Sequence, residues 1–273
     1  MDVTSYGPGC EIIATHISCP SAKRVEFVHQ LEYAGDNVSG AIYRPSTSWN
    51  AIVHQYAKET LERVVLKMAE GPDLLVSCSI AFRSSDRTTL KLCYTHRTVR
   101  AEYETETILE ERLPNIFSQA IQTIRDHPRV ANLKHLHIQG WRLAEGNLEL
   151  VTDVVGRLLG FMGPLEKLSL YGCDLRPYLD PFLDSPLFPK AIQPTSFHPI
   201  KTLAIINPLQ SLHDEVYAAA IVKLAKSQHA RKVPFEVVLL SPTAPSPPVK
   251  YELVAFVDWV GLYDEPLSDE DES

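Results

Sequence analysis

The chain has 273 residues, of which 45% are hydrophobic and 22% charged, a composition typical of a globular protein and unlike that of a disordered one. No apolar run approaches the roughly 20 residues of a membrane-spanning helix, and residues 1–5 lack the pattern of a secretory signal. The five cysteines are widely spaced and form no Cys-x-x-Cys pair. We therefore expect free thiols in a reducing compartment, the cytoplasm or the nucleus.

The formal net charge of −8 comes from the residues at the C-terminal end. From Tyr251 onward there are eight Asp or Glu residues and no Lys or Arg. Subtracting these eight from the 34 acidic residues leaves 26, which balance the 26 Lys and Arg of residues 1–250. A neutral body with an acidic end does not attract nucleic acid, and we expect neither nucleic acid nor a membrane among the partners. Residues 264–273 are expected to form an acidic, disordered tail.

In chain order, the first two strand patterns are Ala22-x-x-Val25-x-Phe27 and Leu61-x-x-Val64-x-Leu66. This spacing places alternate side chains of a short strand in a core. Between the two patterns, residues 48–57 have the apolar spacing of a helix. A strand, a helix and a second strand in this order predict parallel strands joined through a helix.

The next segment departs from this order. Residues 74–82 and 88–94 are two strand-like runs joined by polar residues 83–87, which predicts an antiparallel hairpin. Leu90 and Leu92 fit a further degenerate repeat strand equally well, and both interpretations stay open. The charged residues 97–112 are expected to form a surface excursion.

The most specific pattern lies at residues 165–175, which match the leucine-rich-repeat motif L-x-x-L-x-L-x-x-N/C-x-L at every defined position, with Cys173 in the ninth place. Residues 133–143 match it except at the ninth place, which is Trp141. Shorter forms begin at Ile200 and Phe235, so successive units are 32, 35 and 35 residues apart. A regular spacing of this size is typical of repeat architectures.

Helical patterns accompany these units. They occur in residues 114–124, in residues 147–162 before Gly163-Pro164, and after a Ser211–Asp214 segment that resembles a capping box. We therefore predict an α/β fold, a leucine-rich-repeat-like β/α solenoid of six or seven irregular repeats over residues 1–263. Its parallel strands would line a concave face, with the helices outside and Pro-rich loops at 177–199 and 242–248.

The repeats, the segments Lys223–Ala230 and 233–237, and the closing acidic stretch 264–271 resemble the C-terminal part of fungal F-box/leucine-rich-repeat proteins, from about Cys10 onward. In that family an F-box joins a Skp1–cullin ubiquitin ligase and the repeats hold a substrate. No Leu-Pro-rich helical stretch of the F-box kind precedes Ala22. The resemblance thus implies a substrate-recognition component without its own F-box, with Skp1 and cullin machinery as possible partners.

Residues between the apolar positions of each repeat should point onto the concave face and could bind a protein partner. The candidates form a mixed, basic-leaning surface with Tyr171 as an aromatic anchor: Arg24, Glu26, Arg63, Lys67, His135, His137, Gln139, Lys167, Ser169 and Tyr171. The face then becomes apolar at Ala204, Ile206, Val237 and Leu239, which we expect to lie under residues 251–263. The alternative is that these are solvated strand residues without a partner.

The sequence contains two further candidate sites, one for a metal ion and one for phosphorylation. His135 and His137 share one side of a strand, as metal ligands sometimes do, but a third ligand at a recognisable spacing is missing, so we expect no metal or cofactor. Ser268 precedes acidic residues and is a candidate regulatory phosphorylation site, although a purely solubilising tail is the simpler interpretation.

Motifs for nucleophilic hydrolysis, phosphate binding, dinucleotide binding and zinc proteolysis are absent from the sequence. The expected function is therefore a non-enzymatic protein-binding module. An enzyme whose residues converge from distant loops, and a repeat fragment without an independent function, remain the alternatives.

Overall fold

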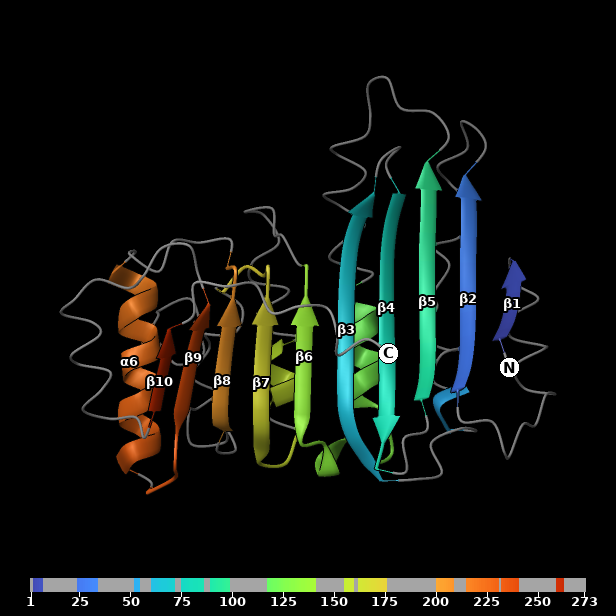
Figure 1. The fold of residues 1–273 in the computed structure, drawn as a ribbon. Coiled ribbons are helices and arrows are strands. Elements are labelled where there is room, and N and C mark those ends of the chain that lie inside the picture. Colours follow the sequence, from blue (N-terminus) through green and yellow to red (C-terminus); the bar gives the residue numbers. More distant parts are fainter. Residues whose placement is uncertain are drawn as a thin grey trace.

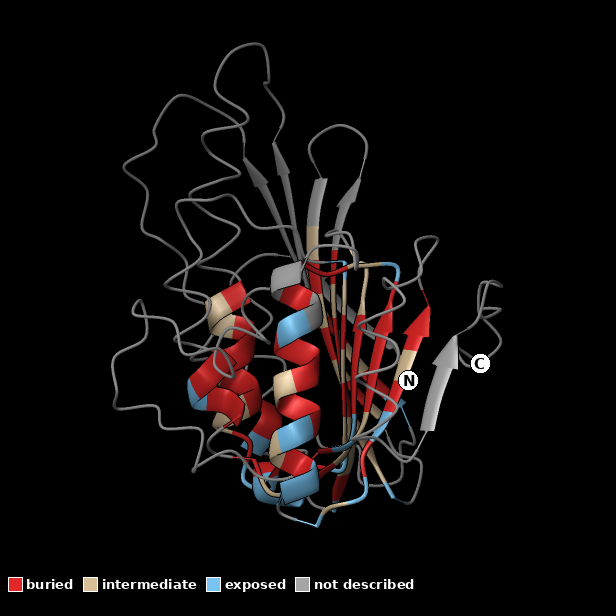
Figure 2. Cartoon of the chain, turned by 90° about the vertical axis from the view of Figure 1, so that its left-hand side faces the viewer, coloured by how far each residue is buried: buried red, intermediate tan, exposed pale blue. Residues whose placement is uncertain are grey.

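The computed structural model describes residues 2–6, 24–33, 52–54, 60–71, 75–85, 89–98, 117–140, 155–159, 162–175, 200–208, 215–230, 232–240 and 259–262. The fold is α/β and consists of one open, mostly parallel sheet with helices packed against one face (Figure 1). Seen along the sheet, the strands form one layer and the helical segments a second layer beside it (Figure 2). The predicted α/β class is confirmed.

The sheet has ten strands in the order β1-β2-β5-β4-β3-β6-β7-β8-β9-β10. Their bounds are Asp2–Tyr6 (β1), Arg24–Tyr33 (β2), Leu61–Gly71 (β3), Leu75–Ser84 (β4), Thr89–Thr98 (β5), His135–Gln139 (β6), Leu165–Tyr171 (β7), Ile200–Ile206 (β8), Glu236–Leu240 (β9) and Trp259–Leu262 (β10). The described helices are α6 (Glu215–Ala230), a 3-10 turn at Val130–Asn132 and helical residues within 52–54, 117–125 and 155–159.

The predicted antiparallel hairpin is confirmed as β4 and β5, in which Ile80 pairs with Leu92. β3 also pairs antiparallel with β4, so β3, β4 and β5 form a meander. β5 also pairs in parallel with β2 on its other edge, and its interpretation as a degenerate repeat strand stays a prediction. The predicted parallel order is interrupted at this meander, since connections of a few residues can join only antiparallel neighbours.

Two rows of apolar side chains cross eight strands in register and form the sheet side of the core. One row is Val25, Leu90, Phe82, Val64, Leu136, Leu168, Leu203 and Val237, and the other is Phe27, Leu92, Ile80, Leu66, Ile138, Leu170, Ile205 and Leu239. All sixteen are buried. Because strand side chains alternate, the residues between them lie on the opposite face, which we call the polar face.

Strands β6, β7 and β8 end in the same way. Each is followed by a residue with positive φ, at +74° for Gly140, +57° for Gly172 and +46° for Asn207. The backbone N–H of each donates to the carbonyl of the last residue of the next strand, at 2.8, 2.8 and 2.6 Å. The turns after β6, β7 and β8 therefore share one geometry, and their spacing matches the 32- to 35-residue spacing of the sequence units.

Cys173, in the ninth place of the predicted motif, is completely buried. Its thiol donates to the carbonyl oxygens of Ile138 in the preceding repeat and of Tyr171, each at 3.2 Å. The Tyr171 carbonyl also accepts the backbone N–H of Gly140, so the thiol is a second donor to this carbonyl at the turn after β7. The motif thus corresponds to a contact between consecutive units.

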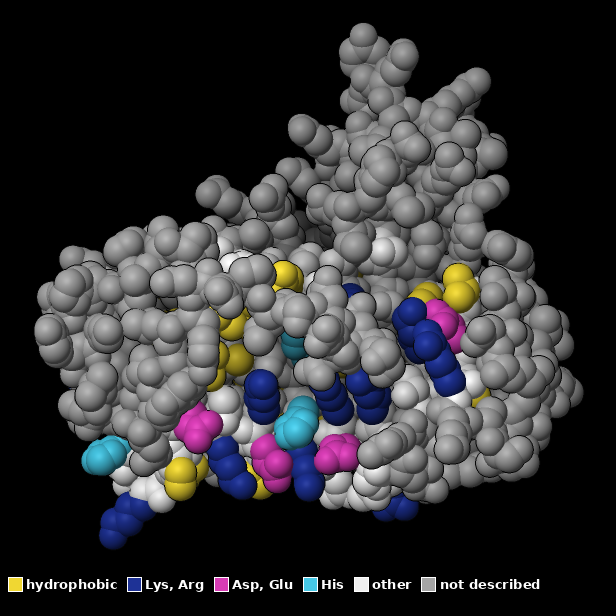
Figure 3. Space-filling model, viewed as in Figure 1, with side chains coloured by type: hydrophobic (Ala, Val, Ile, Leu, Met, Phe, Trp, Pro, Cys, Tyr) yellow, Lys and Arg dark blue, Asp and Glu magenta, His cyan; other side chains and the backbone are white. Residues whose placement is uncertain are grey.

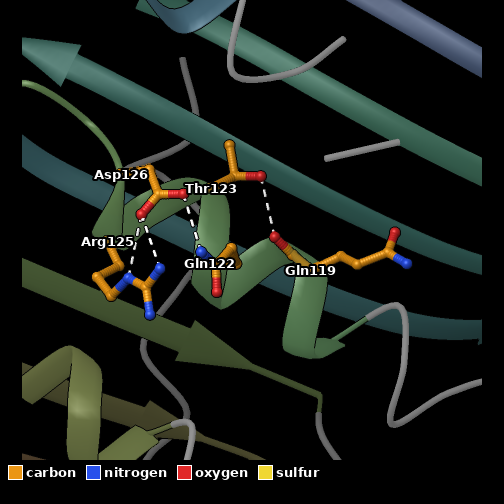
Figure 4. Close-up of polar contacts among 5 residues, drawn as sticks. All are labelled: Gln119, Gln122, Thr123, Arg125 and Asp126. Atoms are coloured by element: carbon orange, nitrogen blue, oxygen red, sulfur yellow. Dashed lines mark hydrogen bonds and ion pairs between the residues drawn. The ribbon is translucent and has the colours of Figure 1, made fainter. Parts of the chain in front are cut away.

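The predicted helices are present wherever they fall within the described residues. Phe117, Ala120, Ile121 and Ile124 point into the core from residues 117–125. Side-chain hydrogen bonds stabilise the last turns of this helix (Figure 4). The buried Thr123 hydroxyl donates to the Gln119 carbonyl at 2.9 Å. The Asp126 carboxylate accepts from Gln122 at 2.9 Å and from Arg125 at 3.0 Å.

The helix predicted over 147–162 has ended before Gly163, as the Gly-Pro pair predicts. A β-carbon at Gly163 would overlap the carbonyl oxygen of Ala131, which explains why glycine stands here. α6 follows β8, and its described residues Ala220, Ile221 and Leu224 are buried. No helix within the described ranges is long and apolar enough to cross a membrane.

The register predicted for the last repeat is wrong. The motif would align Val238 and Leu240 with the core positions Leu203 and Ile205, whereas the structure pairs Val237 and Leu239 with them. Val237 and Leu239 are therefore core residues, 0% and 2% exposed, and do not belong to the binding face as predicted. Residues 237–240 are all apolar, so alternation could not distinguish the two registers, and a shift of one residue exchanges the faces.

Candidate functional site

Eight of the ten candidate residues for partner binding, all except Arg24 and Glu26, lie together on the polar face of three adjacent strands. The register places Arg63 beside His135 and Lys167 in one row, and Lys67 beside Gln139 and Tyr171 in another. His137 and Ser169 lie in the row between them, next to Val65. Cross-strand partners project from the same side of a sheet, so these nine residues form one three-by-three array. Lys and Arg side chains gather on the corresponding part of the surface (Figure 3).

His137 occupies the centre of this array. Burial lowers the pKa of His137, and the positive charges of Arg63, Lys67 and Lys167 lower it further, to about 4 despite an opposing hydrogen bond with Gln139. At neutral pH the imidazole is therefore uncharged and is surrounded by three cations. The low pKa of the central histidine thus reflects burial first and the neighbouring positive charges second.

Carboxylates lie at one margin of the array. Glu166 is 3.8 Å from the Lys134 ammonium group and 3.6 Å from Nε2 of His135. Both ion pairs are substantially exposed and contribute little stability. Among the residues that the structure describes, neither Arg63 nor Lys167 forms an ion pair with a carboxylate.

Arg83 belongs to the same surface, although it was not among the predicted residues. Arg83 pairs with Arg63 across β3 and β4, and its neighbours Phe82 and Ile80 face the core. It adds a fourth cation beside the array. Alternation of Cys78, Ile80 and Phe82 with polar or small residues could have placed Arg83 on the polar face, but the prediction of that face was limited to residues of the repeat patterns.

The predicted residues Arg24 and Glu26 lie on β2, at a distance from the array. Glu26 contacts Lys91 at 2.9 Å and Arg24 at 3.2 Å, and it accepts a weak hydrogen bond from the Cys93 thiol at 3.4 Å. Burial alone would raise the pKa of Glu26, but its contacts, first of all with Lys91, outweigh that effect and lower the pKa. On β2 and β5 two cations thus share the one carboxylate of Glu26, and further cations lie on β4, β3 and β7.

Neither a reactive thiol nor a metal centre is found in the described part of the chain. Burial raises the pKa of Cys93 to about 11, and that of Cys78 is raised as well, so both are thiols at neutral pH. The described residues contain no group of three His, Cys, Asp or Glu that could hold a metal ion, and His135 and His137 have Arg63, Lys67 and Lys167 as neighbours instead.

Ala204 and Ile206 continue the polar face on β8, as predicted, next to Ser169 and Tyr171. They are 2% and 8% exposed. The candidate phosphorylation site Ser268 and the predicted tail 264–273 lie outside the described residues, as do the predicted loops at 177–199 and 242–248.

No family model, curated protein or solved structure matches the chain. The fold and the site define the class: an α/β protein with an open, mostly parallel sheet, one face covered by helices and the other bearing a basic array.

Proposed function

We propose that this chain is a non-enzymatic protein-recognition module and that the three-by-three array on β3, β6 and β7 is its binding face. The observation that supports the proposal is the register that brings Arg63, Lys67 and Lys167 around a neutral His137, with Tyr171 at the corner. Arg and Tyr are enriched among the residues that dominate binding energy at protein interfaces. The partner surface would be acidic.

The proposed architecture is a leucine-rich-repeat-like solenoid, at least over β6 to β9. The repeated positive-φ turns, the identical hydrogen bonds from Gly140, Gly172 and Asn207, and the Cys173 contact to the preceding unit support it. In such repeats the strand face without helices is the surface that commonly binds ligands.

The sequence resemblance extends the proposal to a role as substrate-recognition component of a Skp1–cullin ubiquitin ligase. In this role the array would hold the substrate. The support for the ligase role is the sequence pattern alone.

The test is affinity purification of the tagged chain from its native cells, with quantitative mass spectrometry, for the native chain and for the variant Lys167→Gln/Tyr171→Ala/His137→Gln. We expect specific partners to be lost from the variant and retained by the control Lys226→Gln, whose exposed side chain is on α6. Partners that bind the triple variant undiminished would move the site elsewhere. Co-purification of Skp1 and cullin would support the ligase role, and a partner without them a stand-alone adaptor.

A further inference from the structure

One row of side chains on the polar face crosses six neighbouring strands, with one residue from each. The pairing registers place them in this order from β4 to β9: Arg83, Arg63, His135, Lys167, Thr202 and Glu236. We call them the charged row. Adjacent strands are about 4.8 Å apart, so the row is about 24 Å long. It lies near the beginnings of β3 and of β6 to β9, where charged side chains are at the surface (Figure 3).

The charged row is more accessible than the next row of the polar face, which contains His137. Lys167 and Glu236 are both exposed. In the next row, Val65, Ser169 and Ala204 are only 7%, 6% and 2% exposed. From β3 to β8 the next row is therefore largely closed to a partner, and the charged row forms a strip one residue wide. A strip of this shape fits an extended segment that crosses the strands.

The charges are distributed unequally along the charged row. Arg83, Arg63 and Lys167 are positive over β4 to β7, and Glu236 is negative at the β9 end, two strands or about 10 Å from Lys167. The Thr202 hydroxyl donates to the Glu236 carboxylate at 3.1 Å and orients it. The residues that precede the row on successive strands alternate in sign: Glu62, Lys134, Glu166 and Lys201. They add no net charge, so the polarity comes from the row itself.

We propose that the charged row binds an extended segment of the partner protein, with acidic side chains over β4 to β7 and a lysine or arginine over β9. An extended chain advances about 3.3 Å per residue, so the basic residue would follow the last acidic one by about three positions. Complementary charges determine orientation and partner choice more than affinity. Glu236 would thus fix the direction in which the segment crosses the strands, on the premise of the proposed function that this face binds a protein.

The test compares two labelled peptides of identical composition by fluorescence anisotropy at low ionic strength. The polarised peptide has five glutamates, two serines and a lysine in this order, and the mixed peptide has its lysine among the glutamates. The native chain should bind the polarised peptide about two- to fivefold more tightly, the effect of one exposed ion pair. In Glu236→Lys this preference should reverse. Added salt should reduce the preference, since it screens exposed charges.

Glu62→Lys is the matched control, because it changes the net charge equally but lies on β3, four strands from β9. It should keep the native preference, and circular dichroism should show both variants folded. The proposal is overturned by equal binding of the two peptides to the native chain, which a uniformly acidic ligand site would show. It is also overturned if neither peptide binds, or if Glu236→Lys keeps the native preference.

Failure of this proposal can be distinguished from failure of the proposed function. Loss of a cellular partner from the Lys167/Tyr171/His137 variant would still support the function if the native chain did not discriminate between the peptides. The expected peptide preference, with no cellular partner lost from that variant, would contradict the function and leave the polarity of the charged row established.

Discussion

Two glycines in equivalent turns are constrained to different degrees. Gly140 and Gly172 both have positive φ, a conformation that side chains with a β-carbon rarely adopt. A β-carbon at Gly140 would overlap the carbonyl oxygen of Met68, whereas one at Gly172 would meet nothing within 4 Å. The turn after β6 therefore favours glycine both for its positive φ and for lack of space, and the turn after β7 only for its positive φ.

Gly172→Ala should lower the free energy of unfolding by about 1–2 kcal/mol, the cost of a left-handed conformation. Gly140→Ala should cost clearly more, because the Met68 backbone must also move. Gly172→Asn is the matched control and should cost less than Gly172→Ala, since asparagine tolerates this conformation. Chemical denaturation measures all three, and equal losses at the two alanine variants would contradict the steric argument.

His127 is a buried histidine that couples stability to pH. It is 4% exposed, stacks on Phe82 with ring centroids 5.1 Å apart, and accepts the Arg129 N–H at Nδ1. Burial lowers the pKa of His127 from 6.5 to about 4, with further lowering by His54 and Arg129. Between these pH values the unfolded chain binds a proton that the folded chain does not.

The free energy of unfolding should therefore be greatest above pH 6.5 and fall as the pH is lowered toward 4, by on the order of 3 kcal/mol from His127 alone. Denaturation curves at several pH values should show this slope. His127→Asn keeps an acceptor for Arg129 and should flatten the slope, even though it lowers the absolute stability. If the dependence of the free energy of unfolding on pH is unchanged in this variant, other groups cause the acid sensitivity. His137 is then the first candidate, because its pKa is also lowered to about 4.

At the scale of the element, residues of the core alternate along β7 with residues of the polar face. Leu168 and Leu170 are buried against the helices, while Lys167 and Tyr171 lie on the polar face and Lys167 is exposed. The sequence motif predicted this division correctly because polar and apolar residues alternate strictly there. On β9, where every residue from 237 to 240 is apolar, the same motif predicted the wrong face.

Leu170→Ala should lower the free energy of unfolding by about 2–5 kcal/mol, because it leaves a cavity in a row that spans eight strands. Lys167→Ala on the same strand should change it by less than about 0.5 kcal/mol. Equilibrium denaturation of both variants provides the comparison. A large loss at Lys167 would show that the array stabilises the fold, and partner-binding results with Lys167 variants would need correction for unfolding.

At the scale of the whole molecule, the meander of β3, β4 and β5 is continuous with the parallel strands through the pairing of β3 with β6. Both core rows cross this junction without a break at Val64–Leu136 and Leu66–Ile138. The described strands on either side of the junction thus share one core.

We therefore expect a single unfolding transition. Circular dichroism and tryptophan fluorescence should give coincident denaturation curves. Leu170→Ala on one side of the junction and Phe82→Ala on the other should shift the same transition. Two separated transitions, each sensitive to only one of these variants, would indicate that the meander and the repeats unfold independently.

The sequence by itself determined the local features: the α/β alternation, the repeat motif with Cys173, the hairpin, and the side of the sheet on which Lys167 and His137 lie. These follow from residue spacing, because alternation and helical period are properties of the chain over a few residues. The tertiary structure decided which strands are neighbours. In the sheet, β4 and β5 lie between β2 and β3. Arg24 and Glu26 on β2 are therefore distant from the array, and Arg83 on β4 lies beside it. Pairing between distant segments depends on packing of the whole core, and no local pattern specifies it.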